Sequence, residues 1–142
     1  MAEIASKRPS GKTPVANVRA SVSPIEWETR VNLAACYRLV AMHGWDDLIF
    51  THLSARIPGP DHHFLINPFG PLFEEVTASN LVKIDLEGNI LLDTGYSINN
   101  AGFVIHGAVH EARDDAMAVL HTHTEAGMAV AAQKWGLLPL SQ

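Results

Sequence analysis

Four short strand-like segments separated by turn residues occupy the middle of this chain. The segments "LIFTHLSARI" (48–57) and "HFLINPFG" (63–70) flank Pro58-Gly59-Pro60, and "LVKIDLEGNILLD" (81–93) contains two more around Glu87-Gly88-Asn89. Runs rich in β-branched and aromatic residues, joined by turns that contain Pro, Gly or Asn, are typical of β-hairpins. This region therefore predicts hairpins within an antiparallel or mixed sheet.

A helix is expected before these strands. Ser23 is a typical N-cap, Pro24 suits the first helical position, and Glu26 stands three residues after the cap. The helix should end at Gly44, because glycine commonly terminates helices. Its expected core-facing stripe, at helical spacing, consists of Val31, Ala34, Ala35, Leu39 and Met42.

Helices alternate with strands in the rest of the chain. Thr77 is placed to cap a short helical piece in "EEVTASNL", and Asn99 or Asn100 is placed to cap a helix through "AGFVIHGAVHEAR". A strand "AMAVLH" (116–121), a helix "EAGMAVAAQKW" (125–135) and a strand-like "LLPLS" (137–141) follow. Mixed strands and helices with both hairpin and crossover connections predict an α/β sandwich.

Composition narrows the class of protein. The 142 residues suffice for one domain, and no apolar run is long enough to cross a membrane. Residues 1–22 carry a balance of +3 and are expected to form a disordered basic leader, which leaves −8 on the rest of the chain. An acidic body gives no support to nucleic-acid binding. The single cysteine, Cys36, fits a reducing compartment and predicts a cytoplasmic protein.

A pair of histidines ends the strand-like segment at 116–121. His121 and His123 are two residues apart, so on an extended strand both imidazoles point to the same side. Two such rings can chelate a divalent metal, but a zinc site needs at least three protein ligands. A pair of partly buried histidines with only local hydrogen bonds is the alternative. His106 and His110, four apart on the preceding helix, share one helix face.

Several motifs then resemble one family in the same order. "THLSAR", "NPFG", "VTASNLVKIDLEGN" and "HTHT" are similar to the class II aldolase/adducin family, on its adducin-like side, and the resemblance runs from about Ser23 to the last residue. It implies a three-layer α/β/α sandwich on a mostly antiparallel or mixed sheet, with a homotetramer that has sites at its subunit boundaries. It also implies that residues 23–142 are an incomplete domain, truncated at the carboxyl end.

The resemblance assigns site residues by position. His121 and His123 fall on the first two zinc-ligand positions of the aldolases, whose third histidine would lie beyond Gln142, so low metal occupancy is expected. Internal substitutes for that ligand are His106, His110 and Glu125, none of which matches the family position. The implied substrate pocket for a small carbonyl or sugar-type molecule consists of His52, Asn67, Gly70, Asn100, Ala101 and His106.

Departures from the aldolase pattern stand beside these matches. The family's proton-transferring Glu position is Gly102, which has no group that can give or accept a proton. Phe69 and Ala101 replace hydroxyl residues of the aldolase phosphate pocket, which weakens the expectation of a sugar-phosphate substrate. Three functions therefore stay open: a metal-dependent, aldehyde-lyase-like enzyme, a non-catalytic binding domain like the adducin head of the actin–spectrin skeleton, and an inactive fragment.

Overall fold

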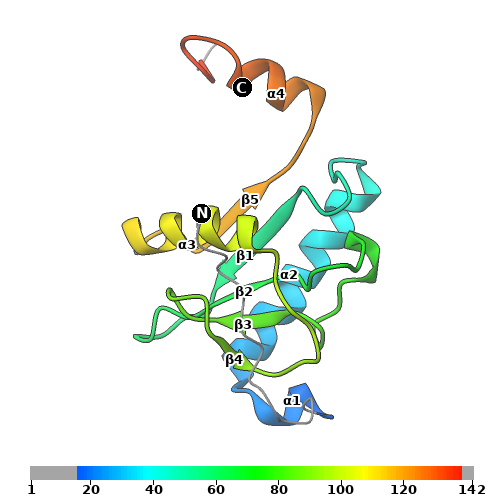
Figure 1. Cartoon of the computed structure of the whole chain (residues 1–142), viewed down its shortest axis with the longest axis vertical. Helices are drawn as coiled ribbons and strands as arrows, with labels where there is room; N and C mark the ends of the chain where they lie inside the picture. Colours follow the sequence, from blue (N-terminus) through cyan, green and yellow to red (C-terminus); the bar gives the residue numbers. More distant parts are fainter. Residues whose placement is uncertain (1–15, 139–142) are drawn as a thin grey trace.

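The computed structural model describes residues 16–138, which contain a five-stranded antiparallel sheet (Figure 1). The strands follow the order β4-β3-β2-β1-β5, and every neighbouring pair is antiparallel. Their bounds are His52–Arg56 (β1), Phe64–Ile66 (β2), Val82–Ile84 (β3), Ile90–Leu92 (β4) and Ala118–His121 (β5). The hairpins expected around the two turns are confirmed as β1–β2 and β3–β4.

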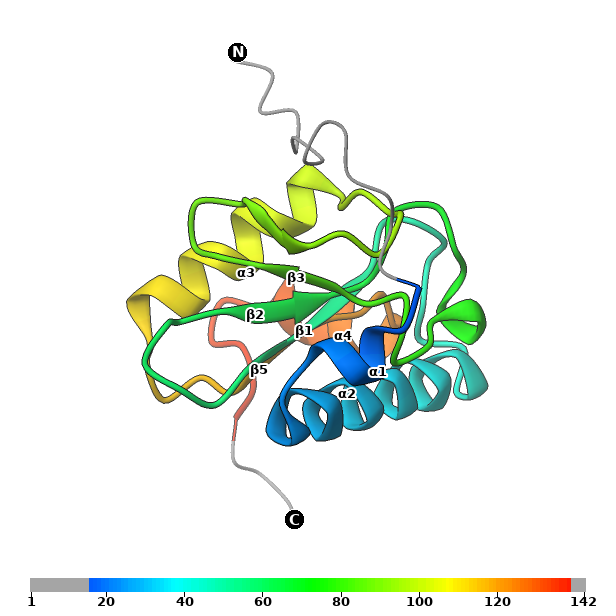
Figure 2. The same ribbon diagram turned by 90° about the horizontal axis from the view of Figure 1, so that it is seen from below.

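Helices lie on both faces of this sheet. The long helix α2 packs against one face and α3 lies across the other, as Figure 2 shows from below. The helical bounds are Val18–Ser21 (α1), Pro24–Met42 (α2), the 3-10 turn Phe73–Glu75 (η1), Asn100–Ala112 (α3) and Glu125–Ala131 (α4). The expected three-layer sandwich on an antiparallel sheet is therefore confirmed. Within residues 16–138, no helix is both long and apolar enough to span a membrane.

The two faces of the sheet carry separate hydrophobic clusters. On the α2 face, Tyr37 and Leu53 belong to a buried cluster that extends to η1 through Phe73. On the α3 face, Phe64 and Ile66 pack with other isoleucines and with Phe103. Because side chains alternate along a strand, β1 points Leu53 toward α2 and its polar neighbours toward α3. This alternation places the polar residues of β1 under α3.

The stripe expected on α2 is wrong in part. Val31, Leu39 and Met42 are exposed, and the buried side of the helix includes the charged residues Glu26 and Arg30. Arg30 donates to Glu26 at 2.9 Å and to the backbone oxygens of Ala78 and Leu81, while Lys83 on β3 completes the group by contacting Glu26. This buried ionic group turns the helix away from the face that apolar spacing predicts.

Other local expectations differ at element boundaries. The first strand begins at His52, because residues 48–50 form a turn in which Phe50 N donates to Asp47 O. Thr77 does not cap a helix: the helical turn η1 precedes it, and its hydroxyl accepts from Asn80 N within a turn. The last part of the expected leader forms α1, capped by Asn17, while residues 1–15 and most of the strand expected at 137–141 lie outside the described residues.

Strand β5 lies at the edge of the sheet, with β1 as its neighbour. The strand expected at 116–121 is present, but its residues are exposed or half-buried, so it is not a buried strand. No residue of α4 is buried, and Figure 1 shows α4 extended beyond the end of β5, away from the sheet. The histidine pair therefore lies at an edge of the described fold rather than inside it.

Candidate metal centre

The pairing of β1 with β5 brings two histidines together. His52 and His121 are directly opposite each other in the register, at the end of the sheet where β5 leads toward α4. His123 follows two residues later, outside the strand, and its Nε2 lies 3.2 Å from Nε2 of His121. The structure thus places the two predicted ligands side by side, with their Nε2 atoms facing each other.

A loop residue holds the second ring of this pair. Asp47 Oδ2 lies 2.8 Å from Nδ1 of His123, and the backbone N–H of His123 donates to Trp45 O. Segment 44–51 consequently runs beside the connection between β5 and α4 (Figure 1). Leu48, next to Asp47, has φ of +47°, a left-handed conformation that is uncommon for leucine. The loop is bent where it presents the carboxylate.

A row of buried polar side chains continues from His121 under α3. His52 Nε2 lies 3.4 Å from His121 Nδ1, and His52 Nδ1 lies 2.8 Å from His106 Nε2. Ser54 Oγ then bridges His106 Nδ1 at 2.6 Å and His110 Nε2 at 2.9 Å. His106, Ser54 and His110 are fully buried, and His52 is 2% exposed. Four histidines and a serine therefore form one continuous hydrogen-bonded row.

Burial keeps these imidazoles neutral. Desolvation, with smaller contributions from neighbouring histidines, lowers the pKa of His52 to about 4 and the pKa of His106 to about 3. Desolvation also lowers the pKa of His110, with the nearby Arg56 charge adding to the effect, and it lowers the pKa of His121. At neutral pH each of these rings consequently has one N–H donor and one bare nitrogen acceptor. Neutral imidazole is the form that binds metals.

Gly102 on α3 lies directly against the His52 ring. A Cβ atom placed on Gly102 would be 2.9 Å from His52 Cδ2 and 3.2 Å from its Nε2, closer than such atoms normally approach. The imidazole therefore fills the space into which a side chain at position 102 would begin. The His52 ring can occupy this position only because residue 102 has no side chain.

The remaining residues of the expected substrate pocket are divided between the two faces. Asn67 is 8% exposed and faces α2, where its Oδ1 accepts from the Tyr37 hydroxyl at 2.9 Å. His52 and His106 lie on the α3 face, so Asn67 does not join them. Asn100 and Ala101 form the first turn of α3, and Gly70 follows β2 in a left-handed conformation.

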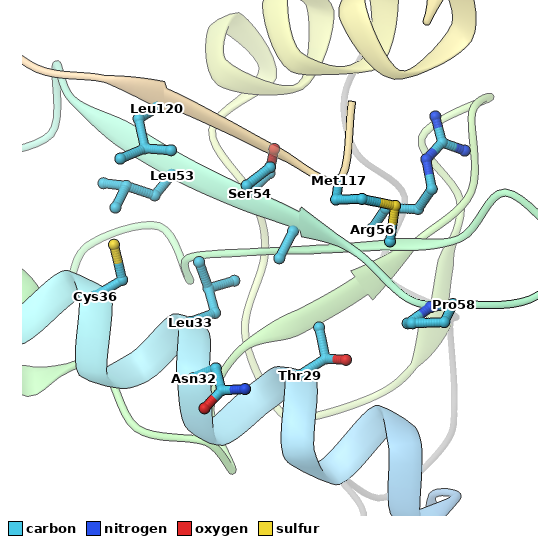
Figure 3. Close-up of a pocket in the computed structure, with 12 residues that line it drawn as sticks. Thr29, Asn32, Leu33, Cys36, Leu53, Ser54, Arg56, Pro58, Met117 and Leu120 are labelled. Carbon is cyan, nitrogen blue, oxygen red and sulfur yellow. The ribbon is translucent and has the colours of Figure 1, made fainter. Parts of the chain in front are cut away.

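A separate apolar groove of about 300 Å³ lies between α2 and the strands β1 and β5 (Figure 3). Leu33 and Cys36 line it from α2, and Leu53, Met117 and Leu120 line it from the sheet side. The half-buried Cys36 thiol has a raised pKa because of burial, so it is a poor nucleophile at neutral pH. None of the clustered histidines lines this groove.

The described residues fit part of a metal site. Two nitrogens that are each about 2.0–2.1 Å from a tetrahedral zinc ion lie about 3.3 Å apart, close to the His121–His123 separation of 3.2 Å. Among residues 16–138, however, no group of three or more His, Cys, Asp or Glu side chains is arranged to hold a metal ion. His106, His110 and Glu125 do not supply a third ligand within that range. The described residues therefore supply two ligands of a tetrahedral site, His121 and His123.

Comparison with known proteins defines the class to which this fold and site belong. The family model described as the class II aldolase and adducin N-terminal domain matches residues 31–142. The chain therefore belongs to the class II aldolase and adducin family.

Individual relatives come from both branches of this family. A crystal structure of an aldolase II superfamily protein from Pseudomonas syringae is 65% identical with a TM-score of 0.81, covering 87% of this chain and 50% of that one. L-fuculose 1-phosphate aldolase from Glaciozyma antarctica PI12 is 36% identical with a TM-score of 0.66, covering 89% of this chain and 49% of that one. Alpha-adducin of Mus musculus is 48% identical over 91% of this chain and 18% of its own length.

The chain spans about half the length of the bacterial relatives that it matches. A candidate class 2 aldolase of Caulobacter vibrioides, 63% identical over 93% of this chain, is covered over 51% of its length.

Sequence reasoning missed two residues of the cluster. Asp47 lies between α2 and β1, and no periodic pattern marks a carboxylate there as a partner of a histidine 76 positions away. Ser54 was one residue of the motif "THLSAR" and received no role. Ser54 is two residues after His52, and this spacing on a strand could have placed both side chains on one face. His110 shared a helix face with His106, but nothing in the sequence showed that this face lies on β1.

Proposed function

We propose that His121 and His123 bind a divalent metal ion, with zinc as the expected ion. The observation that carries this proposal is the approach of their Nε2 atoms to 3.2 Å while Asp47 occupies Nδ1 of His123. A carboxylate behind a ligating histidine orients the ring and increases its basicity. When bound, such an ion acts as a Lewis acid that polarises a substrate carbonyl.

The proposed substrate is a small sugar or sugar-phosphate-like carbonyl compound. Its support is family membership together with the similarity to L-fuculose 1-phosphate aldolase. The remaining metal ligands would be water, substrate, or groups outside residues 16–138. By family resemblance the whole protein is expected to work as a homo-oligomer in the cytoplasm.

The chain's own residues argue against rapid aldol cleavage. Gly102 offers no proton-transfer group, and the His52 imidazole in front of it is buried and hydrogen-bonded to His106. A positioned acid or base typically contributes about 10²–10⁴-fold to such a reaction. We therefore expect carbonyl binding and polarisation, with cleavage of fuculose or rhamnulose phosphates slow or absent.

Zinc titration of the metal-free chain tests the ligand assignment. Isothermal titration calorimetry at neutral pH should show weak zinc binding that disappears in His121→Ala and in His123→Ala. The matched control is His62→Ala, which removes an exposed imidazole on the β1–β2 connection. Equal zinc affinity in all four proteins would overturn the assignment.

A non-catalytic binding domain is the second candidate function. The close contact between Gly102 and His52 favours it, because the space for a side chain at position 102 is taken. The similarity to alpha-adducin supports the same candidate. Co-sedimentation with actin and spectrin separates the candidates: binding that is independent of zinc and of His121 supports a scaffold role and contradicts the metal-dependent one.

A further inference from the structure

We propose that the buried row His110–Ser54–His106–His52 sets which ring nitrogen of His121 carries its proton. The row leaves Nε2 of His121 bare and directed at His123, so these residues position a metal ligand without touching the metal. The tautomers follow from the hydrogen-bond geometry of buried, neutral rings. Only their consequence for metal affinity rests on the function proposed above.

The direction of the row is set at its far end by a backbone carbonyl. His110 Nδ1 lies 3.2 Å from Ala116 O, between α3 and β5. A carbonyl oxygen only accepts hydrogen bonds, so Nδ1 of His110 must carry the proton. Because His110 is neutral, its Nε2 is then a bare acceptor. Within residues 16–138, the hydrogen-bond partner of that atom is the Ser54 hydroxyl at 2.9 Å.

Each following link has one compatible arrangement. The Ser54 hydroxyl donates its single proton to His110 Nε2, so its oxygen accepts from His106 Nδ1–H at 2.6 Å. His106 Nε2 is then bare and accepts from His52 Nδ1–H at 2.8 Å. His52 Nε2 is bare in turn and faces His121 Nδ1 at 3.4 Å. The proton of His121 is therefore on Nδ1, where this acceptor lies.

His123 has the same Nδ1–H tautomer for a separate reason, its contact with Asp47. Asp47 Oδ2 accepts from Nδ1–H of His123 at 2.8 Å, which leaves Nε2 of His123 on the side of His121. Two ring nitrogens without protons, 3.2 Å apart, repel each other unless a cation lies between them. A metal ion or a proton satisfies both. The row thus leaves Nε2 of His121 bare, and the Asp47 carboxylate leaves Nε2 of His123 bare.

Burial holds the row in a single hydrogen-bond direction. Ser54, His106 and His110 have no exposed surface, so solvent water is not at hand to replace a missing partner. An unpaired buried donor or acceptor is costly, which penalises any link that points the wrong way. The direction imposed at Ala116 O is consequently transmitted to His121.

Nitrogen NMR of the metal-free chain, labelled with ¹⁵N at histidine, tests the inference directly. Couplings between ring carbon-bound protons and ring nitrogens distinguish a protonated nitrogen from a bare one. We expect the Nδ1–H tautomer at His110, His106, His52 and His121 at neutral pH. An Nε2–H tautomer at His121, or at His106, would overturn the proposal even if zinc binds as proposed above.

Ser54→Ala removes the central link and supplies the second test. The His106–His52 pair then loses its direction, so His121 should populate both tautomers and zinc affinity should fall about tenfold or more. Ser54→Thr, which keeps the hydroxyl, should restore both. The control is Ile66→Val, because Ile66 is opposite Ser54 in the β1–β2 register and its change lowers stability while every polar group of the row stays in place.

The outcomes separate this inference from the proposed metal site. If the expected tautomers are found and are lost in Ser54→Ala, the inference is supported. Failure of both proteins to bind zinc would contradict only the proposed metal site. A Ser54→Ala protein that folds and keeps the single tautomer at His121 overturns it. If Ser54→Ala does not fold, the tautomers of the unsubstituted chain decide alone.

Discussion

At the scale of single residues, the site depends on two positions, 102 and 52, whose side chains compete for the same space. His52 fills the volume in front of Gly102, so a residue with a side chain at 102 and an imidazole at 52 are incompatible in the present geometry. Introducing a carboxylate by Gly102→Glu alone would force the His52 ring to move, and with it the contact to His106. Any attempt to introduce aldolase-type chemistry must therefore change both positions.

A double-mutant cycle at positions 102 and 52 measures this dependence. Gly102→Ala should lower the free energy of unfolding by about 1–3 kcal/mol, because the added methyl group presses on His52. In a His52→Asn background the same change should cost clearly less, with a coupling energy of about 0.5–3 kcal/mol. Urea unfolding of the four proteins provides the measurement. Additive effects would show that the two residues do not share this space.

Acid should destabilise the fold through its buried histidines. The folded-state pKa of His106 is lowered to about 3 and that of His110 is also lowered, whereas an unfolded histidine titrates near 6.5. Between these values the unfolded chain binds more protons, so stability is highest above pH 6.5 and decreases as the pH falls. The slope should approach about 1.4 kcal/mol per pH unit for each fully buried histidine.

Urea unfolding at several values between pH 7 and pH 4 checks this slope. His106→Gln should reduce the slope, because it removes one of the buried rings that titrate only in the unfolded chain. A stability that does not vary over this range would contradict the assignment of neutral buried rings.

At the scale of elements, α2 is attached to the sheet by an ionic group as well as by apolar packing. Arg30 is fully buried and joins Glu26 on its own helix to the backbone oxygens of Ala78 and Leu81, just before β3. Desolvation lowers the pKa of its guanidinium, and the contacts with Glu26 oppose that effect. The group fixes which face of α2 meets the sheet.

Removing the cation from this group should be strongly destabilising. Arg30→Met leaves Glu26 buried beside Lys83 alone and leaves two carbonyl oxygens without their donor, so we expect a loss of about 3–5 kcal/mol. The exposed Arg38, on the same helix, gives a matched Arg→Met control with little effect. Thermal or urea unfolding followed by circular dichroism compares the two variants. Equal losses would show that the ionic group does not position α2.

At the scale of the whole molecule, apolar surface gathers at one end of the described chain. Edge strand β5 leaves Leu120 55% exposed, and beyond it Met128, Trp135 and Leu137 are exposed on and after α4. Large contiguous apolar surfaces and unpaired strand edges tend to recruit other polypeptide. The chain is therefore expected to self-associate.

Analytical ultracentrifugation over a range of concentrations tests this expectation. Leu120→Lys should shift the distribution toward the monomer, because it places a charge beside the open edge of β5. Leu39→Lys is the control, since Leu39 is exposed to a similar extent, 54%, on α2. A monodisperse monomer at all concentrations, or equal effects of the two lysines, would contradict a role for this edge.

The sequence by itself determined most elements of this protein, although not all of their ends; the helix expected at 125–135, for example, ends at Ala131. Ser23 caps α2 and Asn99 caps α3, because capping and turn formation depend on residues a few positions apart. Hairpins around turn residues, and the family motifs, were readable for the same reason. The placement of His121 and His123 as neighbours also followed from spacing along an extended segment.

Only the tertiary structure decided which distant side chains meet. Apolar spacing could not foresee that Glu26 and Arg30 lie inside, because their burial depends on partners near β3. Nor could it show Asp47 against His123, or Ser54 between two helix histidines. Such contacts arise from strand register and from the crossing of α3 over β1, which bring together residues more than 50 positions apart. Long-range packing, and not local preference, assembled the polar row and set its direction.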